Sequence, residues 1–216
     1  MKVIAALLFN KIMYNLCINE KYLRMEPNKL FLKIFSKDKN KGYFLDLGCG
    51  QGKDSLFMAE NGFDVVAIDK SLDKIKKFEE YLEGKKIKEK ITLLSQDLAD
   101  FDIEKDKYQI INAFNSLQFL PKQNALDVIK KMKNGVKIGG YIVISGFTVN
   151  DSLYQIPENQ HKGFFELGEL KNLFSDFKID FYEESIIDDI GHPGFPEPHK
   201  HCVVRMIAQK LKNSIY

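Results

Sequence analysis

The stretch Phe44–Ser71, FLDLGCGQGKDSLFMAENGFDVVAIDKS, decides the fold of this chain. An apolar run leads into three glycines spaced G-x-G-x-G, at Gly48, Gly50 and Gly52, and a segment with a helical pattern follows. A second apolar run then ends at Asp69. A strand, a glycine loop, a helix and a second strand in this order are typical of an open parallel sheet, in which ligands bind at the carboxyl ends of the strands.

Length and composition indicate one soluble domain over residues 1–216. The chain is long enough to bury a core, and 44% of its residues are hydrophobic and 29% charged. A net charge of +2 gives no argument for binding to nucleic acid or to a membrane surface, and no apolar run is long enough to span a bilayer. Cys17, Cys49 and Cys202 are far apart and lack metal-binding spacing, which favours a reducing cytoplasm.

The N-terminal segment, residues 1–35, is interpreted as helical rather than as a signal peptide. Asn10 and Lys11 interrupt its apolar run, and no small-residue cleavage site follows. Apolar residues recur there at helical spacing, so we expect an amphipathic helix that covers the ligand site. A second helix is expected over residues 28–35.

Strands and helices alternate through residues 43–147, the expected cofactor-binding core. The expected strands are 43–47, 64–68, 91–95, 108–114 and 140–147, and the expected helices are 53–61, 71–82 (capped by Ser71) and 121–132. Because these strands are almost entirely apolar, they indicate a parallel sheet that is buried on both faces. The remaining part, 148–216, is predicted to contain a helix at 166–174 and an antiparallel hairpin of strands 177–187 and 202–210.

Two acids beside the glycine loop indicate a ligand. Asp46 lies inside an apolar strand, where an unpaired carboxylate is costly, so we expect it to face the loop or a ligand cation. Asp69 follows the loop by about 20 residues, the distance at which an acid binds a ribose hydroxyl pair. Dinucleotide sites require G-x-G-x-x-G and a phosphate at the helix N-terminus, whereas Asp54 opens this helix. S-adenosylmethionine has a ribose, an amino group and a carboxylate but no phosphate, and it fits better.

The motif LDLGCGQG followed by Asp69 resembles the class I S-adenosylmethionine-dependent methyltransferases. SQDLADF, NSLQFLP and NGVKIGGYIVIS are similar to the family's later segments, although Ile138 replaces its usual proline, and the resemblance covers about residues 44–210. It implies an α/β, Rossmann-like, seven-stranded and mostly parallel sheet of order 3-2-1-4-5-7-6, with helices on both faces and an antiparallel edge hairpin. CGQGKDSLFMAENGFDVVAIDKS and GFFELGEL look most like the tellurite-resistance group and its thiopurine-methyltransferase-like relatives.

The resemblance implies S-adenosylmethionine as the cofactor and gives each segment a role. The first strand end and the glycine loop would hold the methionine part, Asp69 the ribose hydroxyls, and Asp97 with Leu98 the adenine. The end of the fourth strand would lie nearest the methyl group and its acceptor. The implied cofactor-binding residues are Asp46, Gly48, Cys49, Gly50, Gly52, Asp69, Lys70, Asp97, Leu98, Asn112, Ala113 and Phe114.

A catalytic residue cannot be assigned from the sequence, because a thiolate or chalcogen oxyanion needs no general base, whereas an alcohol or amine can require one. The candidates are Asn115, His161, His192 and His199. His161 beside Lys162 could meet an anionic acceptor, but a solvated loop residue is the favoured interpretation.

The loop GHPGFPEPHKH, within residues 188–201, has two interpretations. Its three histidines, His192, His199 and His201, together with Glu197 are chemically suited to a metal or an anion. Its prolines and glycines also stiffen a long loop. We interpret it as a substrate-side lid or a structural loop and expect no metal.

These observations predict a cytoplasmic S-adenosylmethionine-dependent methyltransferase, a monomer or homodimer, without nucleic-acid or membrane partners. Its acceptor is predicted to be a small molecule, such as a tellurite- or selenite-like oxyanion or a thiol. The alternatives are a metabolite oxygen or nitrogen as acceptor, an NAD(P)-dependent oxidoreductase, which the glycine spacing and Asp54 disfavour, and a non-catalytic S-adenosylmethionine-binding protein.

Overall fold

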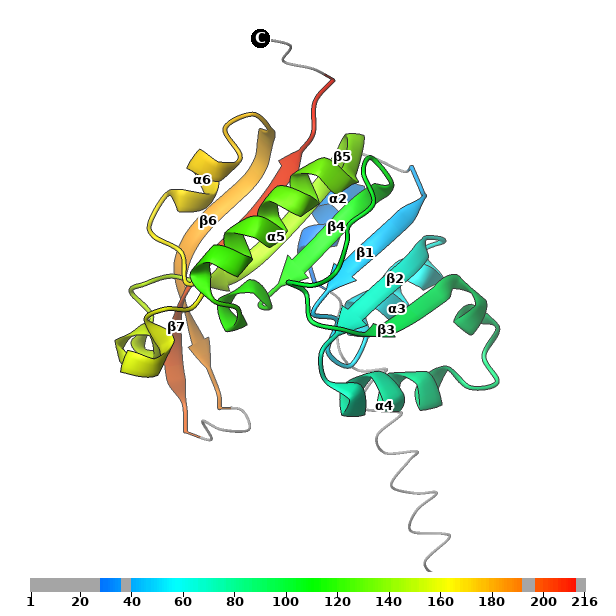
Figure 1. The fold of residues 1–216 in the computed structure, drawn as a ribbon, viewed down its shortest axis with the longest axis horizontal. Coiled ribbons are helices and arrows are strands. Elements are labelled where there is room, and N and C mark those ends of the chain that lie inside the picture. Colours follow the sequence, from blue (N-terminus) through cyan, green and yellow to red (C-terminus); the bar gives the residue numbers. More distant parts are fainter. Residues whose placement is uncertain (1–27, 36–39, 192–196, 213–216) are drawn as a thin grey trace, which may run out of the picture.

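A computed structural model of the chain describes residues 28–35, 40–191 and 197–212. These residues form a seven-stranded sheet with helices against both faces (Figure 1). The strands are β1 (Tyr43–Leu47), β2 (Asp64–Asp69), β3 (Ile91–Ser95), β4 (Tyr108–Phe114), β5 (Val136–Phe147), β6 (Lys178–Asp189) and β7 (His199–Gln209). The helices are α2 (Leu30–Phe35), α3 (Lys53–Glu60), α4 (Leu72–Leu82), α5 (Lys122–Gly135) and α6 (Glu169–Leu173), with short 3₁₀ turns at Lys86–Lys90, Leu117–Phe119, Ser152–Gln155 and Pro157–Asn159.

The strand order is β3-β2-β1-β4-β5-β7-β6, which confirms the predicted fold class. Strands β1 to β5 pair in parallel, and β7 is antiparallel to both β5 and β6. Parallel neighbours need crossover connections, which α3, α4 and α5 supply, whereas a hairpin joins β6 to β7. The start of β7 therefore lies at the same edge of the sheet as the carboxyl ends of the parallel strands.

Each face of the sheet carries its own apolar core. One core contains side chains of α5 and α6, and the other contains side chains of α2, α3 and α4. Side chains alternate between the faces along β1, so that Phe44 enters the second core and Leu45 the first. In Figure 1, α5 lies in front of β4 and β5 while α2 and α3 lie behind the sheet. The predicted burial of both strand faces is thus confirmed.

Several predicted boundaries were wrong: α5 ends later and β5 begins earlier than predicted, α6 begins later, and β7 begins at His199 rather than at residue 202. Helix α5 continues to Gly135 rather than ending at residue 132, and β5 begins at once with Val136 rather than at residue 140. Gly135 allows the end of α5 to pack directly on the loop between β3 and β4. A Cβ atom at this position would lie only 2.3 Å from Ile103 Cγ2 in that loop. Helix α6 begins at Glu169 rather than 166, because Gly168 adopts a left-handed conformation (φ 77°) just before it.

Of the two helices predicted in the N-terminal segment, only the second lies within the described residues. The expected amphipathic helix and its place over the ligand site fall on residues 1–27, which lie outside the described residues. The second expected helix is present as α2, and its Phe31 and Ile34 are buried. None of the helices in the described ranges has the length and apolar character needed to cross a membrane.

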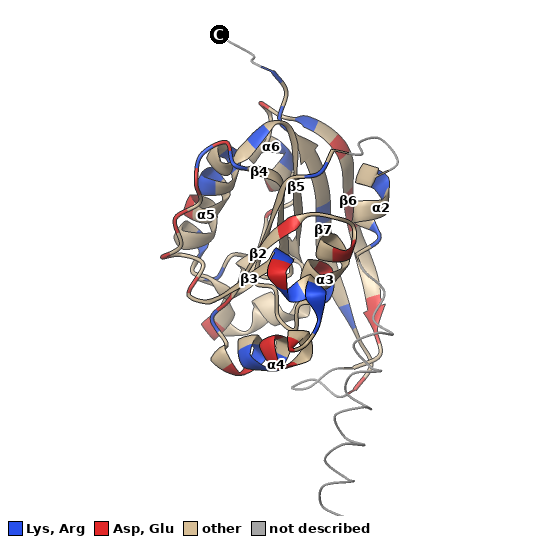
Figure 2. Cartoon of the chain, turned by 90° about the vertical axis from the view of Figure 1, so that its right-hand side faces the viewer, with Lys and Arg blue, Asp and Glu red and all other residues tan. Residues whose placement is uncertain are grey.

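Charge is distributed without a single-sign stripe on the side shown in Figure 2, where basic and acidic residues mix along α4. Ser71 caps this helix as predicted, because its hydroxyl oxygen accepts a hydrogen bond from the Lys74 backbone N–H at 3.4 Å. The cap residue lies two residues after Asp69, which fixes the position of α4 relative to the end of β2.

Candidate functional site

A cavity of about 370 Å³ lies at the carboxyl ends of β1, β2 and β4. This volume is within the range of small-molecule sites. It is lined by residues from the glycine loop, the end of β2, the segment after β3, the segment after β4, and the loop before α6. The lining residues are Gly48, Gly50, Asp69, Lys70, Lys74, Asp97, Leu98, Asn115, Ser116, Phe119, Leu120 and Lys162.

The glycine loop can lie this close to its neighbours only without side chains. A Cβ atom on Gly48 would lie 2.4 Å from Ser116 Cβ, and one on Gly52 would lie 2.1 Å from the Phe78 ring. Both glycines have positive φ, 81° and 80°. The N–H groups of Gly48 and Cys49 donate to the Ile68 carbonyl, so the loop is attached to the end of β2. The loop backbone consequently faces the cavity in one fixed conformation.

Asp69 joins the two backbone segments at the cavity wall. Its Oδ2 accepts a hydrogen bond from the Gly50 N–H and its Oδ1 one from the Ser71 N–H, each at 2.9 Å. A carboxylate has about four acceptor positions, so the two oxygens retain capacity for further donors. Asp69 therefore both fixes the loop and presents an acceptor to the cavity.

Asp46 lies behind the loop and does not line the cavity. It is buried, and it accepts hydrogen bonds from Ser55 Oγ at 2.6 Å and from Asn112 Nδ2 at 2.9 Å. Burial, followed by repulsion from Asp54, raises its pKa to about 7. Asp54 is also buried, and burial raises its pKa as well. The hydrogen-bonding partners of Asp46 therefore lie on α3 and β4 and not in the glycine loop, which differs from the expectation that it faces the loop or a ligand cation.

The end of β4 supplies a strained residue at the cavity. Asn115 has φ 53°, a left-handed conformation that asparagine tolerates better than most residues. Its backbone N–H donates to the Ser145 carbonyl and its Oδ1 accepts from Ser145 Oγ, both at 2.8 Å. Next to it, the Ser116 hydroxyl is buried and has no hydrogen-bond partner among the described residues. This buried hydroxyl and the glycine cradle fit a polar ligand group.

The far wall of the cavity combines apolar and basic groups. Phe119 and Leu120 contribute apolar surface, and Lys162 contributes an ammonium group whose Nζ donates to Asn159 Oδ1 at 2.6 Å. The segment that carries Lys162 is held against the start of α5, because Lys122 Nζ donates to the Phe164 carbonyl at 2.7 Å. An anionic or apolar group is the natural occupant of this wall.

The structure brings seven of the sequence-predicted residues to the cavity and places the others elsewhere. The seven are Gly48, Gly50, Asp69, Lys70, Asp97, Leu98 and Asn115. The five that lie behind or beside the cavity without lining it are Asp46, Cys49, Gly52, Asn112 and Ala113, and Phe114 packs with the second core. Burial and the nearby acids raise the pKa of the Cys49 thiol, which disfavours the thiolate needed for a nucleophile.

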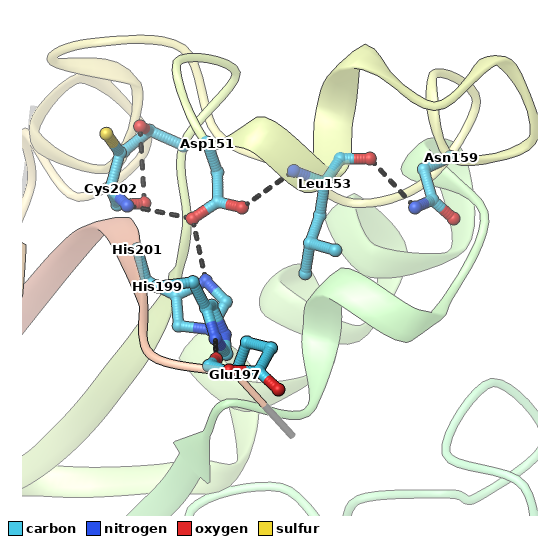
Figure 3. A network of polar contacts seen from close by, with 8 residues as sticks. Asp151, Leu153, Asn159, Glu197, His199, His201 and Cys202 are labelled. Carbon is cyan, nitrogen blue, oxygen red and sulfur yellow. Dashed lines mark hydrogen bonds and ion pairs between the residues drawn. The ribbon is translucent and has the colours of Figure 1, made fainter. Parts of the chain in front are cut away.

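Within the described part of the chain, the predicted catalytic histidines do not line this cavity. His161 is exposed and does not line it, whereas its neighbour Lys162 does. His192 lies outside the described residues. His199 lies in a separate polar cluster with His201 and Asp151 at the start of β7 (Figure 3). Of the predicted catalytic candidates that the structure describes, only Asn115 lines the cavity.

Sequence reasoning missed some lining residues. Lys74 lies one turn into α4, and the capped helix start at Ser71 was its only signal. Ser116, Phe119 and Leu120 belong to NSLQFLP, a segment that the family resemblance had singled out without assigning side chains.

We compared the sequence and the structure of this chain with those of known proteins. The family model described as tellurite resistance protein TehB matches residues 32–191. The chain belongs to the TehB family. The crystal structure of TehB from Haemophilus influenzae superposes with a TM-score of 0.73 at 25% identity, covering 88% of this chain and 65% of that one. A SAM-dependent methyltransferase from Methanosarcina mazei, 19% identical, shares the fold with a TM-score of 0.67 over 84% of this chain and 98% of that one.

Curated relatives of the TehB family chain include two kinds of protein. A Haemophilus influenzae protein named "Probable S-adenosyl-L-methionine-dependent methyltransferase TehB" is 27% identical over 143 residues, which is 66% of this chain and 48% of that protein. A carboxy-S-adenosyl-L-methionine synthase from Colwellia psychrerythraea is 29% identical over 115 residues, 51% of this chain and 46% of that protein. The chain thus spans about half the length of the curated relatives that it matches.

Proposed function

We propose that this chain binds S-adenosylmethionine in the cavity between the glycine loop and Asn115 and transfers its methyl group to a small anionic or soft acceptor. A tellurite- or selenite-like oxyanion or a thiol is the acceptor class we favour. The main observation behind the proposal is the lining of the cavity. The glycine loop, Asp69 and Asp97 line one wall, and Lys162 lines the other. Membership of the TehB family supports the same proposal.

The donor end of the cavity suits a nucleoside. Asp69 Oδ1 and Oδ2 each accept one backbone N–H, which leaves acceptor positions for two ribose hydroxyls. Leu98 is buried, and its apolar surface beside Asp97 suits the face and edge of an adenine. The relatives support this assignment, because the TehB protein and the carboxy-S-adenosyl-L-methionine synthase both carry an S-adenosylmethionine-type molecule in their names.

The other end suits an amino acid better than a phosphate. Two buried acids, Asp46 and Asp54, lie behind the loop and in the first turn of α3, the place where a dinucleotide site would present a helix N-terminus to a pyrophosphate. Carboxyl groups at this place disfavour a phosphate and, when ionised, favour the ammonium group of a methionine moiety. Ser116 Oγ, which is buried and has no hydrogen-bond partner among the described residues, is a polar group suited to its carboxylate or amino end. This arrangement argues against an NAD(P)-dependent oxidoreductase.

The acceptor wall favours an anion that needs no general base. S-adenosylmethionine supplies an activated methyl group on a sulfonium, so the protein's contribution is positioning and exclusion of water. Lys162 offers a positive charge, and Phe119 with Leu120 offers apolar surface. No histidine of the described residues lines the cavity, so a soft anion is favoured over an alcohol. Cys49 and Cys202 are free thiols, which supports a reducing compartment such as the cytoplasm, and we propose a monomer or homodimer there.

Calorimetric titration with S-adenosylhomocysteine tests the donor site. We expect micromolar binding by the wild type and a loss of roughly 30-fold or more in Asp69→Asn, since a hydrogen bond to a charged group contributes roughly 2 kcal/mol. Asp64→Asn is the matched control, because Asp64 lies at the exposed start of the same strand and its Oδ1 contacts only the exposed Lys90 Nζ at 3.1 Å. Wild-type chain that binds NADH instead, or neither ligand, would contradict the proposal.

An acceptor screen follows donor binding. Purified chain is incubated with S-adenosylmethionine and tellurite, selenite or a small thiol, and S-adenosylhomocysteine is quantified. Formation of S-adenosylhomocysteine that depends on one of these acceptors supports the proposed acceptor class. Donor binding without turnover on any of them, but with turnover on an alcohol or amine, would contradict that class and leave the donor site standing.

A further inference from the structure

A cluster of three potential metal ligands lies where β6 and β7 meet, apart from the proposed donor site. Asp189 and His199 are directly opposite each other in the antiparallel ladder, and His201 follows two residues along on the same face. One ligand atom from each of the three residues lies within 4.8 Å of the others. This end of β7 lies at the same edge of the sheet as the cavity, after the end of β5.

The ring of His201 is held in one orientation. Its side chain is 3% exposed, and its Nδ1 lies 3.0 Å from Asp151 Oδ2 (Figure 3). The ring also stacks on Phe147, with 4.4 Å between the ring centroids. Because an ionised carboxylate only accepts hydrogen bonds, the Nδ1 of His201 carries the proton in this pairing. The Nε2 lone pair of His201 is therefore directed into the cluster.

His199 is oriented in a matching way from the other side. Its Nδ1 lies 2.8 Å from the backbone carbonyl oxygen of Glu197, which also only accepts. The Nε2 of His199 then carries a lone pair, and it lies 2.9 Å from the Nε2 of His201. Two lone pairs at this separation repel each other unless a cation joins them. The cation is either a metal ion or a proton shared by the two rings.

We infer that Asp189, His199 and His201 bind a divalent transition-metal ion, with Zn²⁺ as the best match. Two imidazoles and one carboxylate form a common zinc set, and three protein ligands leave one tetrahedral position open. Asp189 has the capacity to join, because only its Oδ1 accepts the Gly191 N–H, at 2.7 Å.

The surroundings of His201 fit this role. Asp151 is completely buried, and its Oδ2 accepts from His201 and from the Cys202 N–H, at 2.8 Å. A carboxylate behind a histidine ligand fixes the ring and raises its basicity, as in many zinc sites. The composition of the loop had led us to expect no metal, because sequence alone does not show that Asp151 lies behind His201 or that the two Nε2 atoms face each other.

Calorimetric titration of the metal-stripped full chain with ZnCl₂ tests the inference. We expect one high-affinity site, weakened at least ~10-fold in His199→Gln and in Asp189→Asn, since each loses one of three ligands. The control for the aspartate is Asp188→Asn, because Asp188 is on the other face of β6 and its side chain is paired, among the described residues, with the exposed Lys200. The control for the histidine is His161→Gln, an exposed histidine outside the cluster. Cys202→Ser is included because a neighbouring thiol is a competing zinc ligand.

Thermal unfolding gives a second readout that detects misfolded variants. At one fixed zinc concentration, the melting temperature is expected to rise in the wild type, in both controls and in Cys202→Ser, and to rise less in His199→Gln and Asp189→Asn. Equal zinc binding by the wild type and His199→Gln would overturn the inference. So would a wild type that binds no zinc but whose melting temperature depends on pH through His199, because that result identifies a shared proton instead.

Discussion

Asn112 donates a hydrogen bond from Nδ2 to Asp46 Oδ1 at 2.9 Å, although 66 residues separate the two. They are register partners on the neighbouring strands β4 and β1. Ser55, in the first turns of α3, donates to the other oxygen of the same carboxylate. The three side chains therefore connect two central strands to the helix behind the glycine loop. Polar residues in two otherwise apolar strands have this structural task, whatever ligand the loop binds.

The raised pKa of Asp46 predicts a stability that falls as pH rises. Burial and the charge of Asp54 move its pKa from an ordinary 3.8 to about 7. Between about pH 4 and about pH 7 the folded chain then holds a proton that the unfolded chain has released, so the unfolding free energy decreases across this window. Asp46→Asn removes this contribution, and urea unfolding at several pH values measures it. Parallel stability curves for wild type and variant would contradict the raised pKa.

Gly50 and Gly52 are predicted to differ in how much stability the chain loses when each is replaced by alanine. A Cβ atom on Gly52 would lie 2.1 Å from the Phe78 ring, and nothing lies within 4 Å of a Cβ atom on Gly50. Gly52→Ala is expected to cost roughly 3 kcal/mol, from overpacking and a left-handed backbone, whereas Gly50→Ala costs roughly 1 kcal/mol from the backbone alone. Denaturant unfolding of the two variants makes the comparison. Equal losses would mean that Phe78 moves aside.

Most of the fold follows from the sequence, because hydrophobic periodicity and glycine positions act locally. The strands 43–47, 91–95 and 108–114 were predicted with the bounds that the structure has. The errors at Gly135 and Gly168 arose where tertiary packing or a left-handed residue sets the end of a helix. Neither the contact of Gly135 with Ile103 nor the conformation of Gly168 is visible in a local pattern.

The candidate site was predictable only as far as it lies on strand ends. Gly48, Asp69, Asp97 and Asn115 follow strands, and parallel strands bring their carboxyl ends to one edge. Lys162 reaches the cavity from a loop 47 residues after Asn115, and no spacing rule predicts that return. The cluster around Asp151 could not be predicted for the same reason. Asp151 and His201 are 50 residues apart in the sequence, and only the folded chain brings them together.

Lys162 is predicted to act on the acceptor and not on the donor. Lys162→Gln is expected to raise the KM for an anionic acceptor roughly 10-fold, because one charge interaction at a partly exposed site is worth roughly 1.4 kcal/mol. The affinity for S-adenosylhomocysteine is expected to stay unchanged, and Lys162→Arg is expected to restore part of the loss. Lys200→Gln, an exposed lysine on β7, is the control for a general change of charge. If Lys162→Gln weakened the binding of S-adenosylhomocysteine as much as it raised the KM for the acceptor, the assignment of Lys162 to the acceptor would be contradicted.

Asp151 is predicted to be a main stabiliser of the segment after β5, independently of any metal. It is fully buried, and its two oxygens accept hydrogen bonds from the Leu153 N–H at 2.9 Å, the Cys202 N–H at 2.8 Å and His201 Nδ1 at 3.0 Å. Asp151→Asn replaces one acceptor oxygen with a donor and leaves buried donors without a partner.

The expected loss for Asp151→Asn is roughly 2–4 kcal/mol, since each unpaired buried donor costs about 1–3 kcal/mol. Urea unfolding in the presence of a chelator measures it, with Asp188→Asn as a control because that carboxylate is exposed and pairs with the exposed Lys200. The control is expected to change stability by less than about 0.5 kcal/mol. If the two variants were equally stable, the hydrogen bonds of Asp151 would have to be replaced by water, and the carboxylate behind His201 would not be a rigid support for its ring.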